Sequence, residues 1–117
     1  MVNLKRLLQS FKCAFRGLGS VVKKEQNFRV HIIAALLAIF FGIYFEIKLW
    51  QWSLIILMVA AVFILELVNT AFERLADMLE PKIHDYVREI KDIMSAIVLI
   101  ASLTSLIIAL LVFLPYF

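Results

Sequence analysis

The sequence predicts an all-α integral membrane protein with a single domain over residues 1–117, built from an N-terminal amphipathic surface helix and three transmembrane helices. Hydrophobic residues make up 64% of the chain and charged residues only 18%, whereas soluble domains are roughly 45–50% apolar. The chain has only three Gly and two Pro, which leaves few turn residues for a β fold. Its one cysteine excludes an intramolecular disulfide and a multi-cysteine metal cage.

The first predicted element is the surface helix, over residues 1–27. Apolar residues recur in it at steps of three and four between Leu4 and Val22, as on one face of a helix. Residues 1–29 contain seven Lys or Arg and a single acid, Glu25. A basic amphipathic helix beside a membrane segment is typical of the lipid headgroup interface. The net charge of +3 therefore indicates a membrane surface and not a nucleic-acid partner.

Two apolar runs predict a tight helical hairpin over residues 28–47 and 49–79. Trp50 and Trp52 follow the short connection between them, and tryptophan at such a point is typical of the aromatic belt of a bilayer. The second helix is expected to continue out of the membrane to about Leu79, because no Gly or Pro interrupts the chain before Pro81.

The third crossing helix is predicted over residues 92–117, whose final 25 residues carry no charge. Lys and Arg are frequent in residues 1–29 and in residues 74–91. The connection within the hairpin has one Lys, and the C-terminal residues have no Lys or Arg. The positive-inside rule then places the N-terminus on the cytoplasmic side and the C-terminus outside.

Four polar residues share one face of the second crossing helix. At 100° per residue, Glu66, Asn69, Glu73 and Asp77 fall within an arc of about 80°. Ionisable groups next to a long uncharged run usually face a polar cavity or a partner, and their oxygen atoms suit Mg²⁺ or Ca²⁺ better than zinc. We call these four residues the polar stripe. The alternative, that the helix simply emerges into water here, has most weight at Asp77.

Several spaced motifs together resemble a known family. The pattern Glu66-Leu-Val-Asn-Thr-Ala-Phe-Glu73, then Asp77, then Lys91-Asp92, is similar to that of the small bacterial integral-membrane lipid kinases. These are the prokaryotic diacylglycerol kinases and their undecaprenol kinase relatives. The N-terminal half agrees through Ser10-Phe11-x-x-Ala14-x-x-Gly17 and Glu25-x-Asn27-Phe28-Arg29-x-His31.

The resemblance implies transfer of the ATP γ-phosphate to a lipid hydroxyl at the cytoplasmic face of the bacterial cell membrane, by a homotrimer that uses Mg²⁺. It implies that Glu66 is the general base beside Asn69, and that Glu25 and Glu73 are Mg²⁺ ligands. The residues that it implies for ATP binding are Arg6, Cys13, Glu25, Glu73, Lys82, His84, Lys91 and Asp92. The residues that it implies for the lipid are Ala14, Gly17 and Ser95.

Undecaprenol is the expected acceptor and diacylglycerol the alternative, because the motif variants look closer to the undecaprenol kinase branch of Gram-positive bacteria. Two classes without enzymatic activity compete with the kinase. A pore subunit would carry polar groups through the bilayer, yet residues 30–45 and 98–117 are nearly all apolar. A scaffold that only binds headgroups gives no reason for Glu66 and Asn69 so near the membrane. The kinase accounts for the polar stripe and for its confinement to one edge.

Overall fold

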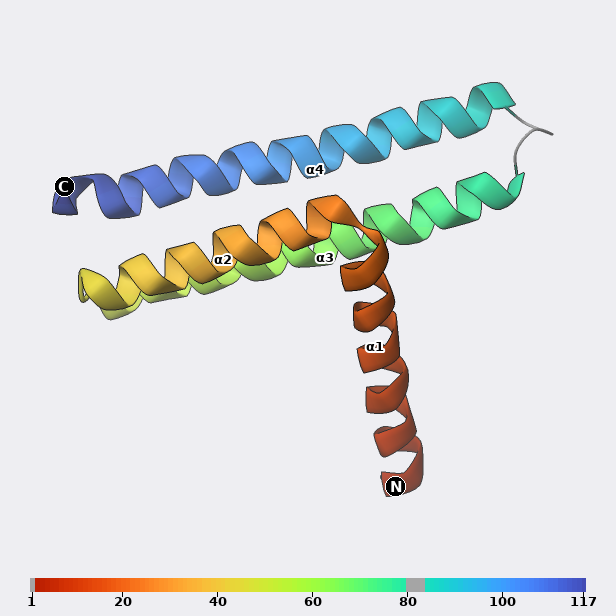
Figure 1. Ribbon diagram of the computed structural model, residues 1–117, viewed down its shortest axis with the longest axis horizontal. Coiled ribbons are helices and arrows are strands. Elements are labelled where there is room, and N and C mark those ends of the chain that lie inside the picture. Colours follow the sequence, from red (N-terminus) through yellow and green to blue (C-terminus); the bar gives the residue numbers. More distant parts are fainter. Residues whose placement is uncertain (1, 80–83) are drawn as a thin grey trace.

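The computed structural model describes residues 2–79 and 84–117 and shows these as almost entirely helical (Figure 1). The helices are α1 (Leu4–Lys24), α2 (Gln26–Tyr44), α3 (Leu49–Leu79), α4 (His84–Phe113) and the short 3-10 helix η1 (Leu114–Tyr116). Helices α2, α3 and α4 run along the longest axis of the molecule, and α3 packs against both of the others. Helix α1 projects away from this group at the point where it meets α2 (Figure 1).

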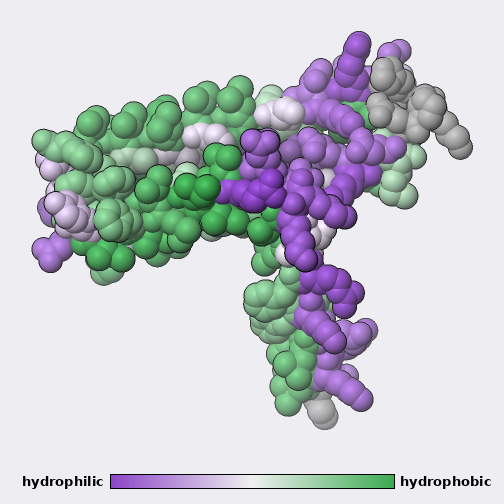
Figure 2. Space-filling view, viewed as in Figure 1, coloured by the Kyte–Doolittle hydropathy of each residue, from purple (hydrophilic) through white to green (hydrophobic). Residues whose placement is uncertain are grey.

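Three helical stretches are long and apolar enough to cross a membrane. They are Gln26–Tyr44, Leu49–Leu79 and Asp85–Tyr116, which contain 18-residue windows with mean hydropathies of 1.7, 2.4 and 3.0. On the face that Figure 2 shows, apolar side chains cover much of α2–α4, and polar side chains gather at the end where α1 joins. A helix satisfies its own backbone hydrogen bonds, so this apolar exterior can face lipid. The predicted class, an all-α protein with three helices suited to a membrane, is confirmed.

The helix boundaries differ from the predicted ranges at two places. Helix α4 begins at His84 and not at residue 92, because no Gly or Pro interrupts residues 84–92. Helix α1 ends at Lys24, short of the predicted residue 27. Helix α3 runs from Leu49 to Leu79 as one element, and Pro81, where the turn is expected, lies outside the described residues.

A single extended residue makes the corner between α1 and α2. Glu25 has φ −109° and ψ 112°, so it leaves the helical region while both neighbours remain in it. The Arg29 guanidinium reaches back and donates Nη1 hydrogen bonds to the carbonyls of Val22 (3.1 Å) and Lys23 (2.8 Å). A cation on the last carbonyls of a helix satisfies acceptors that lack an internal partner. Arg29 therefore links the first turn of α2 to the end of α1.

The turn between α2 and α3 is a Schellman motif. The N–H of Ile47 donates to the carbonyl of Gly42 at 3.2 Å, and that of Glu46 donates to Ile43 at 3.3 Å. Glu46 takes the left-handed position with φ 50°, where glycine would be favoured because it has no Cβ. The connection is thus a closed helix end and not a free loop.

The start of α3 is capped by its own side chain. Gln51 Oε1 accepts a hydrogen bond from the N–H of Lys48 at 2.9 Å, which is the reach-back contact of a capping box. The same oxygen accepts a hydrogen bond from the Tyr116 hydroxyl at 2.7 Å. The C-terminus is therefore tied to the hairpin turn. A buried core lies at this end of the molecule, made of Ile47, Ile55, Val112 and Phe113.

Candidate active site

The polar stripe lies on the continuous helix α3, and burial decreases along it. The side chains of Glu66 and Asn69 are buried, with 2% and 8% of their surface exposed. Glu73 is half-buried and Asp77 is exposed. The stripe therefore passes from a dry end beside the apolar body to a wet end near Leu79.

Glu66 meets a histidine from α2. His31 Nε2 lies 3.1 Å from Glu66 Oε1, and the His31 side chain is four-fifths buried. The two atoms approach without the alignment of a hydrogen bond, so Glu66 Oε1 has no hydrogen-bond partner among the described residues. Burial of a carboxylate is costly unless it is paired, and the imidazole supplies the only opposing group that the described part of the chain places within ion-pair distance.

Asn69 lies between the two glutamates of the stripe. Its Nδ2 donates a hydrogen bond of 3.5 Å to Glu73 Oε1, which orients the amide along the helix. Its Oδ1 is buried and finds no hydrogen-bond partner in the described residues. Buried polar atoms are nearly always satisfied in native proteins. An unpartnered oxygen here is thus a free acceptor at the centre of the stripe.

The corner at Glu25 lies against the same part of α3. Arg74, the residue after Glu73, places Nη2 3.8 Å from Glu25 Oε1. The same guanidinium donates an Nη1 hydrogen bond of 3.2 Å to the Ser20 hydroxyl of α1. Both side chains of the Arg74–Glu25 pair are partly exposed. The structure therefore brings the predicted metal ligand Glu25 to the polar end of α3.

Helix α4 contributes a cation to the wet end of the stripe. Lys91 Nζ lies 2.6 Å from Asp77 Oδ1, so the predicted nucleotide contact is joined to the stripe. Asp92 and Ser95 follow on the same helix and are exposed.

The predicted residues of α1 lie apart from the stripe. Arg6 and Cys13 are exposed and line a shallow depression on α1, and Ala14 and Gly17 are exposed as well. At 1.5 Å per residue, Cys13 is about 18 Å and Arg6 about 28 Å from the Glu25 corner along α1. One chain does not bring these two residues to the carboxylates. Lys82 lies outside the described residues, and His84 opens α4 but its side chain is not described.

The polar stripe contains oxygen donors of the kind that Mg²⁺ prefers. No group of three or more His, Cys, Asp or Glu side chains in residues 2–79 and 84–117 could hold a metal ion. Mg²⁺, however, commonly takes one or two carboxylates and completes its shell with waters and phosphate oxygens. The half-buried Glu73 and the unpartnered Asn69 Oδ1 supply oxygen donors of the right kind. The residues fit an ion that arrives with a phosphate ligand.

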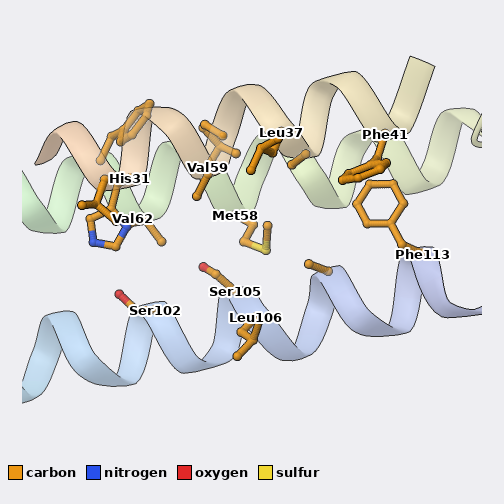
Figure 3. A pocket seen from close by; sticks show the side chains of 16 residues that line it. His31, Leu37, Phe41, Met58, Val59, Val62, Ser102, Ser105, Leu106 and Phe113 are labelled. Carbon is orange, nitrogen blue, oxygen red and sulfur yellow. The ribbon is translucent and has the colours of Figure 1, made fainter. Parts of the chain in front are cut away.

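A cleft lies among α2, α3 and α4, and its lining includes His31, the neighbour of the buried Glu66. It has a volume of about 430 Å³ and is lined almost entirely by apolar side chains. Figure 3 shows His31 near one end, with Phe41 and Phe113 toward the other. The hydroxyl residues Ser102 and Ser105 of α4 also line it. His31 therefore contacts Glu66 and borders this cleft.

Sequence reasoning missed two neighbours of the predicted residues. His31 has no second ligand at metal spacing, so nothing in the sequence indicates a role as a metal ligand. A signal was nevertheless present, since it is a polar residue inside an otherwise apolar run. Arg74 offered no such signal, because a basic residue at the end of a membrane helix is common. Only its contacts with Glu25 and Ser20 distinguish it.

Comparison with known proteins identifies a family for this chain. A family model described as prokaryotic diacylglycerol kinase matches residues 12–113. The chain is 36% identical over 113 residues to an undecaprenol kinase of Bacillus subtilis (strain 168), which covers 97% of this chain and 92% of that protein. It is 29% identical over 102 residues to a diacylglycerol kinase of Escherichia coli (strain K12), with 87% and 84% covered. A diacylglycerol kinase of Helicobacter pylori (strain ATCC 700392 / 26695) is 30% identical over 98 residues, with 84% and 77% covered.

Proposed function

The chain belongs to the prokaryotic diacylglycerol kinase family and is a lipid kinase, and we propose that it transfers the γ-phosphate of ATP to undecaprenol. The observation that carries this choice of lipid is the 36% identity to an undecaprenol kinase over nearly the whole of both chains. The diacylglycerol kinases match at lower identity and over a smaller share of the chain. Diacylglycerol is the alternative acceptor.

Glu66 is the proposed general base. It lies at the boundary between the apolar body and the polar end, where a lipid hydroxyl at the membrane surface would meet ATP from the aqueous side. Glu66 is buried, with 2% of its surface exposed. The carboxylate would take the proton of the hydroxyl as that oxygen forms its bond to the γ-phosphorus and ADP leaves with the bridging oxygen. Asn69 would hold the reacting groups at the same depth through its free Oδ1.

The nucleotide would bind toward the wet end of the stripe. Glu25 and Glu73 are the proposed ligands of Mg²⁺, which when bound neutralises phosphate charge. Lys91 and Asp92 would contact the nucleotide from α4, and Lys82 and His84 are also proposed to bind it. This division agrees with the burial along α3, because phosphates are hydrated and a base benefits from a dry setting.

The active enzyme is proposed to be a homotrimer in the bacterial cell membrane, with its N-terminus and site on the cytoplasmic side. Arg6 and Cys13 lie about 28 Å and 18 Å along α1 from the corner at Glu25, too far to reach the carboxylates of their own chain. This distance supports a site that is shared between copies. Both residues could reach nucleotide bound to a neighbouring copy. Ala14, Gly17 and Ser95 would lie against the lipid headgroup, α1 resting on the membrane surface.

The test is phosphorylation by the purified protein in mixed micelles that offer undecaprenol and diacylglycerol in equal amounts with Mg²⁺ and labelled ATP. We expect the label mainly in undecaprenyl phosphate. Label mainly in phosphatidic acid would overturn the choice of lipid and keep the kinase reaction. A folded protein that labels neither lipid would contradict both proposals.

A further inference from the structure

The buried carboxylate of Glu66 needs a partner, and the described residues offer His31 within ion-pair distance. Taking a carboxylate out of water costs several kcal/mol in proteins unless another group compensates. The two other described cations near the stripe are occupied elsewhere, Arg74 by Glu25 and Lys91 by Asp77. From α4 the described groups that line the neighbouring cleft are hydroxyls and apolar side chains.

The contact between His31 and Glu66 is set by packing one helical turn away. Phe28 of α2 is buried, with 3% of its surface exposed. Its ring lies 5.2 Å from that of Phe63 on α3, measured between centroids. Phe28 precedes His31 by three residues on α2, and Phe63 precedes Glu66 by three residues on α3. The two rings therefore lie on the same helix faces as His31 and Glu66. The aromatic contact fixes the register that brings Nε2 within 3.1 Å of Oε1.

We infer that His31 is a positioning residue for the phosphoryl transfer, an inference that rests on the proposed role of Glu66 as the base. A donor hydrogen on Nε2, brought into line with Oε1, would hold the carboxylate of Glu66 in one rotamer. In this proposal the other oxygen, Oε2, takes the proton of the acceptor hydroxyl. Removing an outer partner that orients a metal ligand typically costs a factor of about ten to a hundred, and we expect an effect of that order for a residue that orients a catalytic carboxylate.

The test compares two substitutions at this position. His31→Leu removes the polar contact and keeps side-chain bulk, and His31→Gln retains a donor. We expect His31→Leu to lower kcat about tenfold or more while the KM for ATP stays unchanged, and His31→Gln to recover part of the loss. Thr104 of α4 is exposed and donates a hydrogen bond to the Ile100 carbonyl of its own helix. Thr104→Ala is the control and should keep wild-type kcat. Equal kcat for His31→Leu and the wild type would overturn the inference.

A second measurement does not depend on activity. We expect His31→Leu to lower the melting temperature less in a Glu66→Gln background than in the wild type, because neighbours in contact are not additive. Equal shifts in the two backgrounds would show that the histidine does not act through Glu66, and would overturn the inference. A wild-type protein inactive on both lipids would instead contradict the proposed function, whatever the result of this thermal cycle.

Discussion

At the scale of residues, the order of burial along α3 separates two chemical tasks. Glu66 and Asn69 are buried and each keeps one oxygen without a hydrogen-bond partner among the described residues. Glu73 and Asp77 reach the polar end, where Arg74 and Lys91 also lie. Electrostatic effects are larger in a dry setting. A proton acceptor at the dry end and phosphate-binding groups at the wet end are therefore compatible on one helix face.

The role of the base is tested by Glu66→Gln. The amide keeps the size of the side chain but cannot take the proton, so we expect kcat to fall by about 10²- to 10⁴-fold. ATP binding, followed by equilibrium titration, should remain close to wild type. Retained turnover would remove Glu66 as the base.

The metal role is tested by Glu73→Gln. Loss of one carboxylate ligand should raise the Mg²⁺ concentration needed for half-maximal rate by about tenfold or more, on the scale of metal-site substitutions. The exposed Glu89 of α4 provides the matched control, and Glu89→Gln should leave the Mg²⁺ titration unchanged. An identical Mg²⁺ dependence for Glu73→Gln and the wild type would rule out the proposed ligand.

At the scale of elements, two corners determine how the helices meet. The α2–α3 turn is closed by backbone hydrogen bonds from Glu46 and Ile47, and the indole of Trp52 covers Gly42. The α1–α2 corner depends on side chains, because Arg29 caps α1 and Arg74 contacts Glu25. The first corner is thus part of the packed core, and the second belongs to the polar end.

A matched pair of glycine substitutions tests the packing of the hairpin. A Cβ at Gly42 would lie 2.6 Å from Trp52 Cη2, whereas one at Gly19 would meet nothing within 4 Å. Trp52 packs against the core cluster, which restricts its movement. We expect Gly42→Ala to destabilise the protein by about 1–3 kcal/mol and Gly19→Ala to stabilise it by about 0.5–1 kcal/mol. Thermal unfolding in detergent measures both, and a higher melting temperature for Gly42→Ala would show that the indole yields freely.

The α1–α2 corner is tested by Arg29→Gln. The shorter side chain should lose its hydrogen bonds to Val22 and Lys23, so α1 should take a wider range of directions. The measurement uses a Ser53→Cys variant that carries one spin label at Cys13 and one at position 53. Dilution with unlabelled protein isolates the distance between the two labels of one chain, and Arg29→Gln should broaden the distribution of that distance. Arg16→Gln, an exposed charge within α1, is the control. An unchanged distribution for Arg29→Gln would mean that other contacts fix the corner.

At the scale of the whole molecule, polarity is divided along the long axis. The apolar exterior of α2–α4 occupies one part, and the charged residues of α1 and of the ends of α3 and α4 occupy the other (Figure 2). Residues 1–29 carry seven basic side chains, and the last 25 residues carry no charge. Basic segments remain on the cytoplasmic side. The charged end is therefore expected to face the cytoplasm, where ATP is present.

Thiol labelling tests this topology. Cys13 is exposed and is the only cysteine, so a maleimide that cannot cross the membrane should label it in inverted vesicles and not in intact spheroplasts. A Phe117→Cys variant that also carries Cys13→Ala should show the reverse pattern, because three crossings put the two ends on opposite sides. Both proteins should be labelled after detergent is added. Labelling of both positions from one side would contradict three crossings.

Much of the molecule follows from local sequence alone. The long apolar runs, the scarcity of Gly and Pro, and the uninterrupted stretch from Leu49 to Leu79 determine the helices, because helical hydrogen bonds join residues four apart. The polar stripe also follows, since residues at three- and four-residue steps share a helix face. The start of α4 at His84 was missed, because a change in hydropathy marks where a helix enters the membrane and not where it begins.

Which polar side chains meet depends on how the helices pack. The pairs His31–Glu66, Arg74–Glu25 and Lys91–Asp77 each join different elements. Their partners depend on helix rotation and register, which are set by packing such as that of Phe28 on Phe63. Hydropathy and helical period locate a residue on its own helix but contain no information on the neighbouring one. That is the physical reason why the sequence determined the candidate carboxylates, while the histidine beside the buried one emerged only when the helices were packed together.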